Sequence, residues 1–219
     1  MKMTQKKRPT IQQLNDFRTM LAAAKTDSDL EKLNRFIDEY DTFTQVYEED
    51  GKKGVKNAAG QVLIPAEYDE IGYTFMDHLM PLAVPVVKDG KLAFVAMDGK
   101  GTMRSDFIYD DIEYTPECCY IVVKDGKKGI ALHNGREVVP SEMDEVSLPF
   151  NGLAYFQKDG KYGFALIYEE LLTGAFFEDF ELGENEYLEV TRDGVKGYID
   201  SEGVFTTDED QKYFGAFFK

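Results

Sequence analysis

The sequence predicts a mainly β protein built from five antiparallel β-hairpin repeats, each a three-stranded meander, behind an N-terminal α-helical hairpin. Asp-Gly dipeptides occur at residues 50, 89, 125, 159 and 193, so the turns are 34 to 39 residues apart. Apolar residues recur at fixed offsets on both sides of these turns, with the two-residue period of strands. Before about residue 45 the apolar period is instead that of a helix.

Residues 1–45 are expected to form the helical hairpin. Thr10 with Gln13, and Ser28 with Glu31, have the spacing of capping boxes, and an amphipathic run follows each pair. We expect this hairpin to cover a sheet edge that would otherwise be open. Residues 46–219 are expected to form the β-repeat domain.

Each repeat is expected to contain two tight turns with glycine where φ is positive. A type I′ hairpin turn needs positive φ at both central residues, which favours Asp-Gly. A second turn follows nine residues later, except in the fourth copy, which has Glu169 and Glu170 there. The predicted turn glycines are Gly51, Gly90, Gly126, Gly160 and Gly194, followed by Gly60, Gly99, Gly135 and Gly203.

Four copies end in the pattern apolar, acid, acid, apolar. The outer members are three residues apart, so the acids are expected in a turn or bulge between two buried residues. Solvated turn acids are the simplest interpretation, and an acidic row that binds a basic partner is the alternative. These candidate binding residues are Asp69, Glu70, Asp110, Asp111, Asp144, Glu145, Glu178 and Asp179.

Lysines also recur with the repeat. One follows the turn glycine in four copies, at Lys52, Lys91, Lys127 and Lys161. Lysine near exposed strand ends discourages pairing between sheets, so we interpret this row first as protection against aggregation and second as a binding row.

With these motifs the chain resembles the bacterial tryptophan-glycine (WG) repeat family. Residues 125–146, DGKKGIALHNGREVVPSEMDEV, follow the family's order of turn, lysine, strand, glycine turn, proline-containing strand and acidic end. The resemblance spans about residues 43–210, but the chain has no tryptophan. The positions that would hold it are Lys53, Leu92, Lys128, Tyr162 and Lys196.

A strand trio cannot bury its apolar face alone, so successive copies are expected to share one hydrophobic interior. Three strands per copy and drifting spacings favour an open, elongated twisted series. A closed, propeller-like ring is the alternative. The resemblance implies an architecture and says little about activity.

Composition and motifs argue against several classes of function. The formal net charge of −16 disfavours nucleic acid or an anionic membrane as partner. His78 and His133 lack second ligands at metal-binding spacing, and the paired acids are copies of one environment rather than the two that a glycosidase needs. We therefore expect no metal, no cofactor and no enzymatic activity.

The sequence thus predicts a non-catalytic repeat scaffold that binds another protein, and the negative net charge favours a basic one. An acidic cytoplasmic immunity or inhibitor protein that neutralises a basic toxin is one alternative, and a glycan-binding module is another. The only cysteines, Cys118 and Cys119, are adjacent, which fits reduced thiols and a cytoplasmic location. The partner and the oligomeric state stay open.

Overall fold

The computed structural model describes residues 44–57, 60–72, 83–115, 119–150, 152–167, 170–182, 188–200 and 202–211. It also describes seven single positions with helical backbone, which are Gln13, Asp16, Met20, Ser28, Glu31, Lys32 and Arg35. An i,i+4 ion pair joins Arg35 Nη2 to Glu31 Oε2 at 3.3 Å. These positions do not make up a helix, and the rest of the predicted helical hairpin lies outside the described residues. The hairpin, its covering role and the boundary at residue 45 therefore stay predictions.

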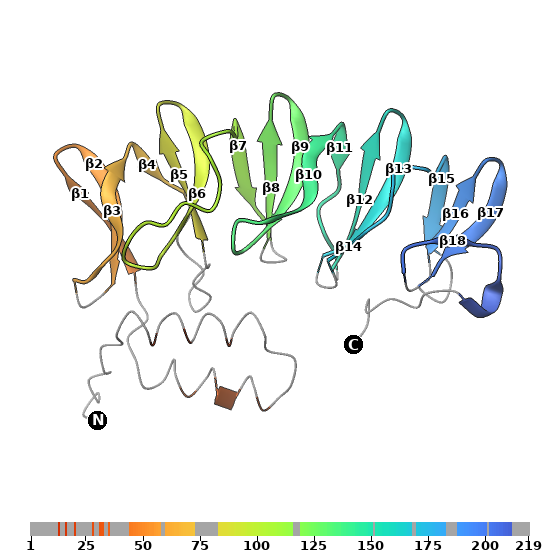
Figure 1. Ribbon diagram of the computed structural model, residues 1–219, viewed down its shortest axis with the longest axis horizontal. Coiled ribbons are helices and arrows are strands. Elements are labelled where there is room, and N and C mark those ends of the chain that lie inside the picture. Colours follow the sequence, from red (N-terminus) through yellow and green to blue (C-terminus); the bar gives the residue numbers. More distant parts are fainter. Residues whose placement is uncertain are drawn as a thin grey trace. The chain divides into compact units, whose positions relative to one another are not determined.

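The described strands form five antiparallel sheets, which follow one another along the chain (Figure 1). The first sheet is β1-β2-β3, with bounds Thr44–Glu49, Lys52–Asn57 and Val62–Tyr68. The second is β4-β5-β6, with bounds Glu70–Ile71, Ala83–Lys88 and Lys91–Ala96. The predicted mainly β class is confirmed, and none of these sheets closes into a barrel.

The third sheet has the order β10-β9-β8-β7, with β7 to β10 at Asp111–Tyr114, Cys119–Lys124, Lys127–Leu132 and Glu137–Met143. The fourth is β11-β12-β13-β14, at Glu145–Val146, Leu153–Lys158, Lys161–Leu166 and Leu171–Leu172. The fifth is β15-β16-β17-β18, at Asp179–Leu182, Leu188–Arg192, Val195–Ile199 and Phe205–Thr206. A short 3-10 helix, η1, spans Glu209–Gln211.

The sheets are offset from the sequence repeats by one short strand, which corrects the expected three-stranded unit. Every sheet after the first begins with a strand, β4, β7, β11 or β15, that starts at the second acid of the preceding copy. This strand pairs with the hairpin of the next copy, so the third, fourth and fifth sheets have four strands. The second sheet has three because an isolated bridge, Val95 with Met103, replaces its last strand.

The predicted hairpin turns are confirmed by their backbone angles. The aspartate of each Asp-Gly pair has φ between 50° and 53°, and the following glycine has φ between 73° and 77°. Both central residues are therefore in the positive-φ region that a type I′ turn requires. The second turns also have positive-φ glycines, while the fourth copy places Glu170 at φ 55°.

Contacts divide the chain into two compact units, Met1–Ile108 with His133–Gly135, and Tyr109–Leu132 with Arg136–Lys219. In the first unit, Val55 and Ile64 of the first sheet share a buried cluster with Val86 and Val95 of the second. In the second unit, one cluster joins the third and fourth sheets and another joins the fourth and fifth. The predicted shared interior of neighbouring copies is thus confirmed within each unit.

The small residue before each central apolar position is explained by close backbone approach. A Cβ built on Gly54 would lie 2.5 Å from Ile64 O, and one on Gly129 would lie 2.6 Å from Val139 O. The third strand crosses these glycines where the ladder changes register. The second copy has Ala93 instead, in the sheet whose last strand is replaced by a single bridge.

The described residues contain no helix with the length and apolarity needed to cross a membrane.

Candidate functional site: acid clamps between neighbouring repeats

The first acid of each pair lies where the chain passes from one sheet to the next. In all four copies its N–H donates to the carbonyl two residues before the next turn aspartate, at 2.8 Å. The four pairs are Asp69 with Val87, Asp110 with Val123, Asp144 with Gln157, and Glu178 with Thr191. The backbone of the first acid is therefore fixed to the following hairpin.

The carboxylate of the same residue accepts a second bond from that hairpin, at the N–H of its turn. Asp69 Oδ2 accepts from Asp89 N at 2.9 Å, and Asp110 Oδ2 accepts from Asp125 N at 2.7 Å. Asp144 follows the same rule with Asp159 N at 2.8 Å. Glu178, whose side chain is one methylene longer, reaches the next residue, Gly194 N, at 3.0 Å.

A lysine of the preceding hairpin binds the other carboxylate oxygen. Lys52 Nζ lies 2.5 Å from Asp69 Oδ1, and Lys161 Nζ lies 3.0 Å from Glu178 Oε1. Lys127 makes the equivalent ion pair with Asp144. In each case the lysine precedes its acid by 17 residues. We call this arrangement, a carboxylate held by a lysine of its own copy and a turn N–H of the next, an acid clamp.

The acid clamps shift the acid–base equilibria of their members. The Lys52 ammonium, and then the Asp89 N–H, lower the pKa of Asp69 below its ordinary value. Lys127 and Asp159 N–H lower the pKa of Asp144, and Lys161 and Gly194 N–H that of Glu178. The same ion pairs raise the pKa of Lys52 and Lys127. Each shift favours the charged form of the bridging group.

The second acids divide into two kinds according to the residue at the tryptophan position. Where that residue is lysine, the acid is glutamate and the two form an ion pair, Lys53 with Glu70 at 2.5 Å and Lys128 with Glu145. Where that residue is Leu92 or Tyr162, the acid is aspartate and accepts the N–H of the next residue. Asp111 Oδ1 accepts from Ile112 N, and Asp179 Oδ1 from Phe180 N, both at 2.9 Å.

The structure therefore places all eight predicted acids at the connections between copies, as turn or strand-start residues with partners in the chain. Their role in binding another molecule stays a prediction. The lysines were interpreted as protection against aggregation, and that interpretation missed their pairing with the first acids. The 17-residue interval shared by three copies was the signal that could have revealed it, while Lys91 precedes Asp110 by 19 residues.

The remaining candidates offer little chemistry. His133 Nε2 is buried and has no hydrogen-bond partner among the described residues, and burial lowers the pKa of its imidazole. His78 and Cys118 lie outside the described residues, and Cys119 is buried. Within the described ranges, no three His, Cys, Asp or Glu side chains are grouped so that they could hold a metal ion.

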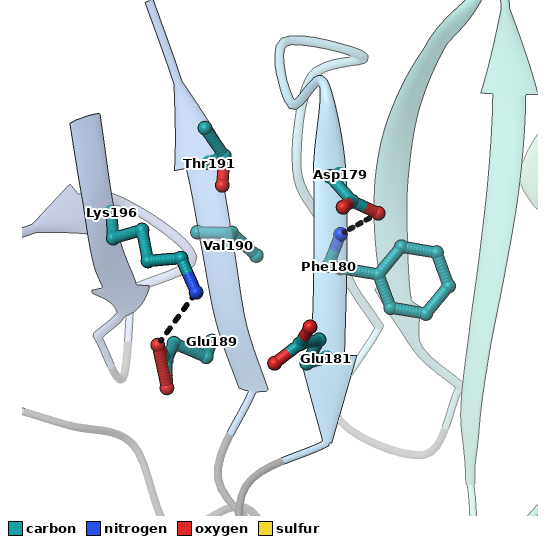
Figure 2. Close-up of a pocket in the computed structure, with 7 residues that line it drawn as sticks. All are labelled: Asp179, Phe180, Glu181, Glu189, Val190, Thr191 and Lys196. Atoms are coloured by element: carbon teal, nitrogen blue, oxygen red, sulfur yellow. Dashed lines mark hydrogen bonds and ion pairs between the residues drawn. The ribbon is translucent and has the colours of Figure 1, made fainter. Parts of the chain in front are cut away.

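One shallow pocket lies on the fifth sheet (Figure 2). Its volume is about 20 Å³, which is room for about one water molecule. Glu181 and Glu189 pair across β15 and β16 on one face, and Lys196 Nζ approaches Glu189 Oε1 at 3.8 Å. Phe180 packs against the buried cluster shared with the fourth sheet. This pocket is too small for an organic substrate.

The solved structures that the chain is similar to have low sequence identity and low TM-scores. PorZ, a surface component of the type-IX secretion system of Porphyromonas gingivalis, is 11% identical over 74% of this chain and 25% of its own, with a TM-score of 0.28. A eukaryotic initiation factor is 12% identical over 75% of this chain and 51% of its own, with a TM-score of 0.33. This chain thus spans about a quarter and about a half of the lengths of these two chains.

No curated protein matches the chain. The family model of the WG containing repeat matches residues 54–75 and 133–162. The first segment runs from the strand glycine of the first copy through its acid pair, and the second runs from the second turn of the third copy through the next hairpin. These two segments of the chain are therefore similar to the WG containing repeat.

Proposed function

We propose that this chain is a non-catalytic repeat module that binds another protein through the charged surface of its copies. The observation that carries this proposal is that the shifted carboxylates have structural partners. Lysine and backbone N–H groups of the acid clamps lower the pKa of Asp69, Asp144 and Glu178. A catalytic carboxyl group usually has its pKa moved toward the working pH by burial or by a like charge. The pKa of each of these three carboxyl groups is instead moved away from neutral pH.

The charge of the chain favours a basic partner. The formal net charge is −16, and the aspartate at the tip of every Asp-Gly hairpin is exposed. Complementary charge accelerates the encounter of two proteins and disfavours partners of the same sign. We also propose a cytoplasmic location, because two adjacent cysteines, Cys118 and Cys119, suit a reducing compartment.

Affinity purification from native lysate, with the full chain as bait, tests this proposal. A discrete basic protein should be recovered at low salt and released at about 0.5 M NaCl, where exposed charges are screened. The Asp159→Asn/Asp193→Asn variant, which neutralises two exposed hairpin tips, is a matched bait that should retain less of it. If repeated purifications return only chaperones, the proposal fails.

A narrower form of the proposal is that the basic partner is a toxin which this protein inhibits. The net charge of −16 is the feature that favours it. Co-expression of the chain should then protect cells from a toxin encoded beside its gene. Absence of protection would remove this form while leaving the general proposal in place.

A further inference from the structure

The first sheet differs from the other four at the edge formed by β1. In the later sheets, the first hairpin strand, β5, β8, β12 or β16, lies between its hairpin partner and a short strand from the preceding copy. In the first sheet, β1 is the end strand and pairs only with β2 among the described residues. Among the described strands, one edge of β1 therefore has no counterpart of the short strand found in the other four sheets.

The other sheets show which backbone groups such a strand would contact. Its N–H binds the carbonyl two residues before the turn aspartate, at 2.8 Å in all four sheets. The equivalent acceptor on β1 is Glu48 O, and the turn N–H equivalent to that of Asp89 belongs to Asp50. Within the described part of the chain, neither group has a bond of this kind. Two hydrogen-bonding positions of the repeat thus have no partner at β1 among the residues that the structure describes.

The one described residue at the usual interval before the first turn is not in a strand. In the last three copies, the first acid lies 15 residues before the turn aspartate, as with Asp144 and Asp159. The position 15 residues before Asp50 is Arg35. Its backbone is helical and its guanidinium binds Glu31. A helical residue cannot make the ladder bonds of a strand.

Charge distinguishes β1 from its counterparts. The residue before the turn aspartate is cationic in the four later copies, at Lys88, Lys124, Lys158 and Arg192, and each of these strands is covered by an acidic segment. The corresponding residue of β1 is Glu49, and Glu48 precedes it. Like charges placed opposite each other destabilise a strand pair. An acidic strand, or a second β1, would therefore be repelled, and a basic strand would be attracted.

We propose that the open edge of β1 binds an extended basic segment of a partner protein by strand addition. This rests on the proposed function and specifies its partner. Strand addition takes affinity from backbone hydrogen bonds and specificity from alternate side chains. The pairing of Glu70 with Val87 and of Ile71 with Val86 sets the pattern. By this register, the segment carries Lys or Arg opposite Glu48 and Glu49, followed by an apolar residue opposite Tyr47.

Two fluorescent heptapeptides test the proposal with the full-length chain. One is residues 141–147 of this protein, SEMDEVS, which contains the covering strand β11. The other is the same peptide with Asp144→Lys and Glu145→Lys. In fluorescence anisotropy the basic peptide should bind about tenfold tighter than the acidic one, because two cross-strand repulsions become attractions. Backbone N-methylation should abolish binding, since it removes the ladder donors.

Variants of the chain locate the binding. Glu48→Lys/Glu49→Lys should reverse the preference between the two peptides. The control, Glu67→Lys/Glu113→Lys, changes the net charge equally at two exposed strand glutamates away from the β1 edge and should leave the preference unchanged.

Failure of the basic peptide to bind would overturn the proposal, as would equal binding of both peptides, tolerance of N-methylation, or binding unaffected by the Glu48→Lys/Glu49→Lys variant. A basic partner recovered from lysate without peptide binding would leave the proposed function intact and place its site elsewhere. Peptide binding without any partner recovered from lysate would support strand addition at β1 and count against the proposed function.

Discussion

Replacing Gly129 by alanine tests the close approach of strands inside a repeat. The new Cβ would lie 2.6 Å from Val139 O, 2.7 Å from Ser141 N and 2.8 Å from Ser141 Cα. All three are backbone atoms, so the third strand itself must move. Overpacking of this kind costs about 3 kcal/mol, the upper end of the usual range, because no flexible side chain can absorb it.

Gly126→Ala is the matched control, because Gly126 has φ +77° and nothing within 4 Å of an added Cβ. Its cost is backbone strain alone, about 1 kcal/mol. Urea unfolding followed by tyrosine fluorescence should therefore give a loss of unfolding free energy about three times larger for Gly129→Ala. Equal losses, or a neutral Gly129→Ala, would refute the explanation of the strand glycines.

Three further predictions concern the acid clamps, the strained turn and the core. Because the pKa of Asp144 is lowered in the folded state, its contribution to stability is present above the unfolded pKa and is lost as the pH falls through the folded pKa. Asp144→Asn should therefore lower the Tm at pH 7 and leave it nearly unchanged at acid pH, in calorimetry across a pH series. Glu170→Gly should raise the free energy of unfolding by about 0.5 kcal/mol, because glycine removes the strain at φ 55° while the exposed pair with Arg136 contributes little. Phe156→Ala should cost about 4 kcal/mol in urea unfolding, because the ring is only 2% exposed inside the cluster that joins the third and fourth sheets.

The features that local sequence determines were predictable. An Asp-Gly pair specifies its turn without reference to the rest of the chain, so all five hairpins were located from their dipeptides. The buried positions three residues before each turn, such as Val86 and Val122, followed from the register that the turn fixes. These predictions needed no knowledge of which copies are neighbours.

The offset of the sheets was not predictable by the same means. Strands such as β4 and β11 contain two residues each, too few to show a period, and their ladder partners belong to the next copy. The acid clamp needs the same non-local information, because its turn N–H lies 15 to 20 residues further along the chain. The acids and the lysines are visible in the sequence. That one carboxylate binds both a lysine of its own copy and a turn N–H of the next copy is not.

The departures from the repeat can be understood from the acid clamp rather than from the missing tryptophan. At the tryptophan position, Lys53 and Lys128 instead form ion pairs with the second acid of their own copy. In the fifth copy the clamp lysine is replaced by Val195, and η1 follows the last strand of this copy in place of an acid pair. A lysine there would have no first acid to hold. In the first copy the cation before the turn becomes Glu49. The first and fifth copies thus depart from the repeat where the described chain holds no neighbouring copy to complete an acid clamp. This is the pattern expected if the acid clamp is the unit of repetition.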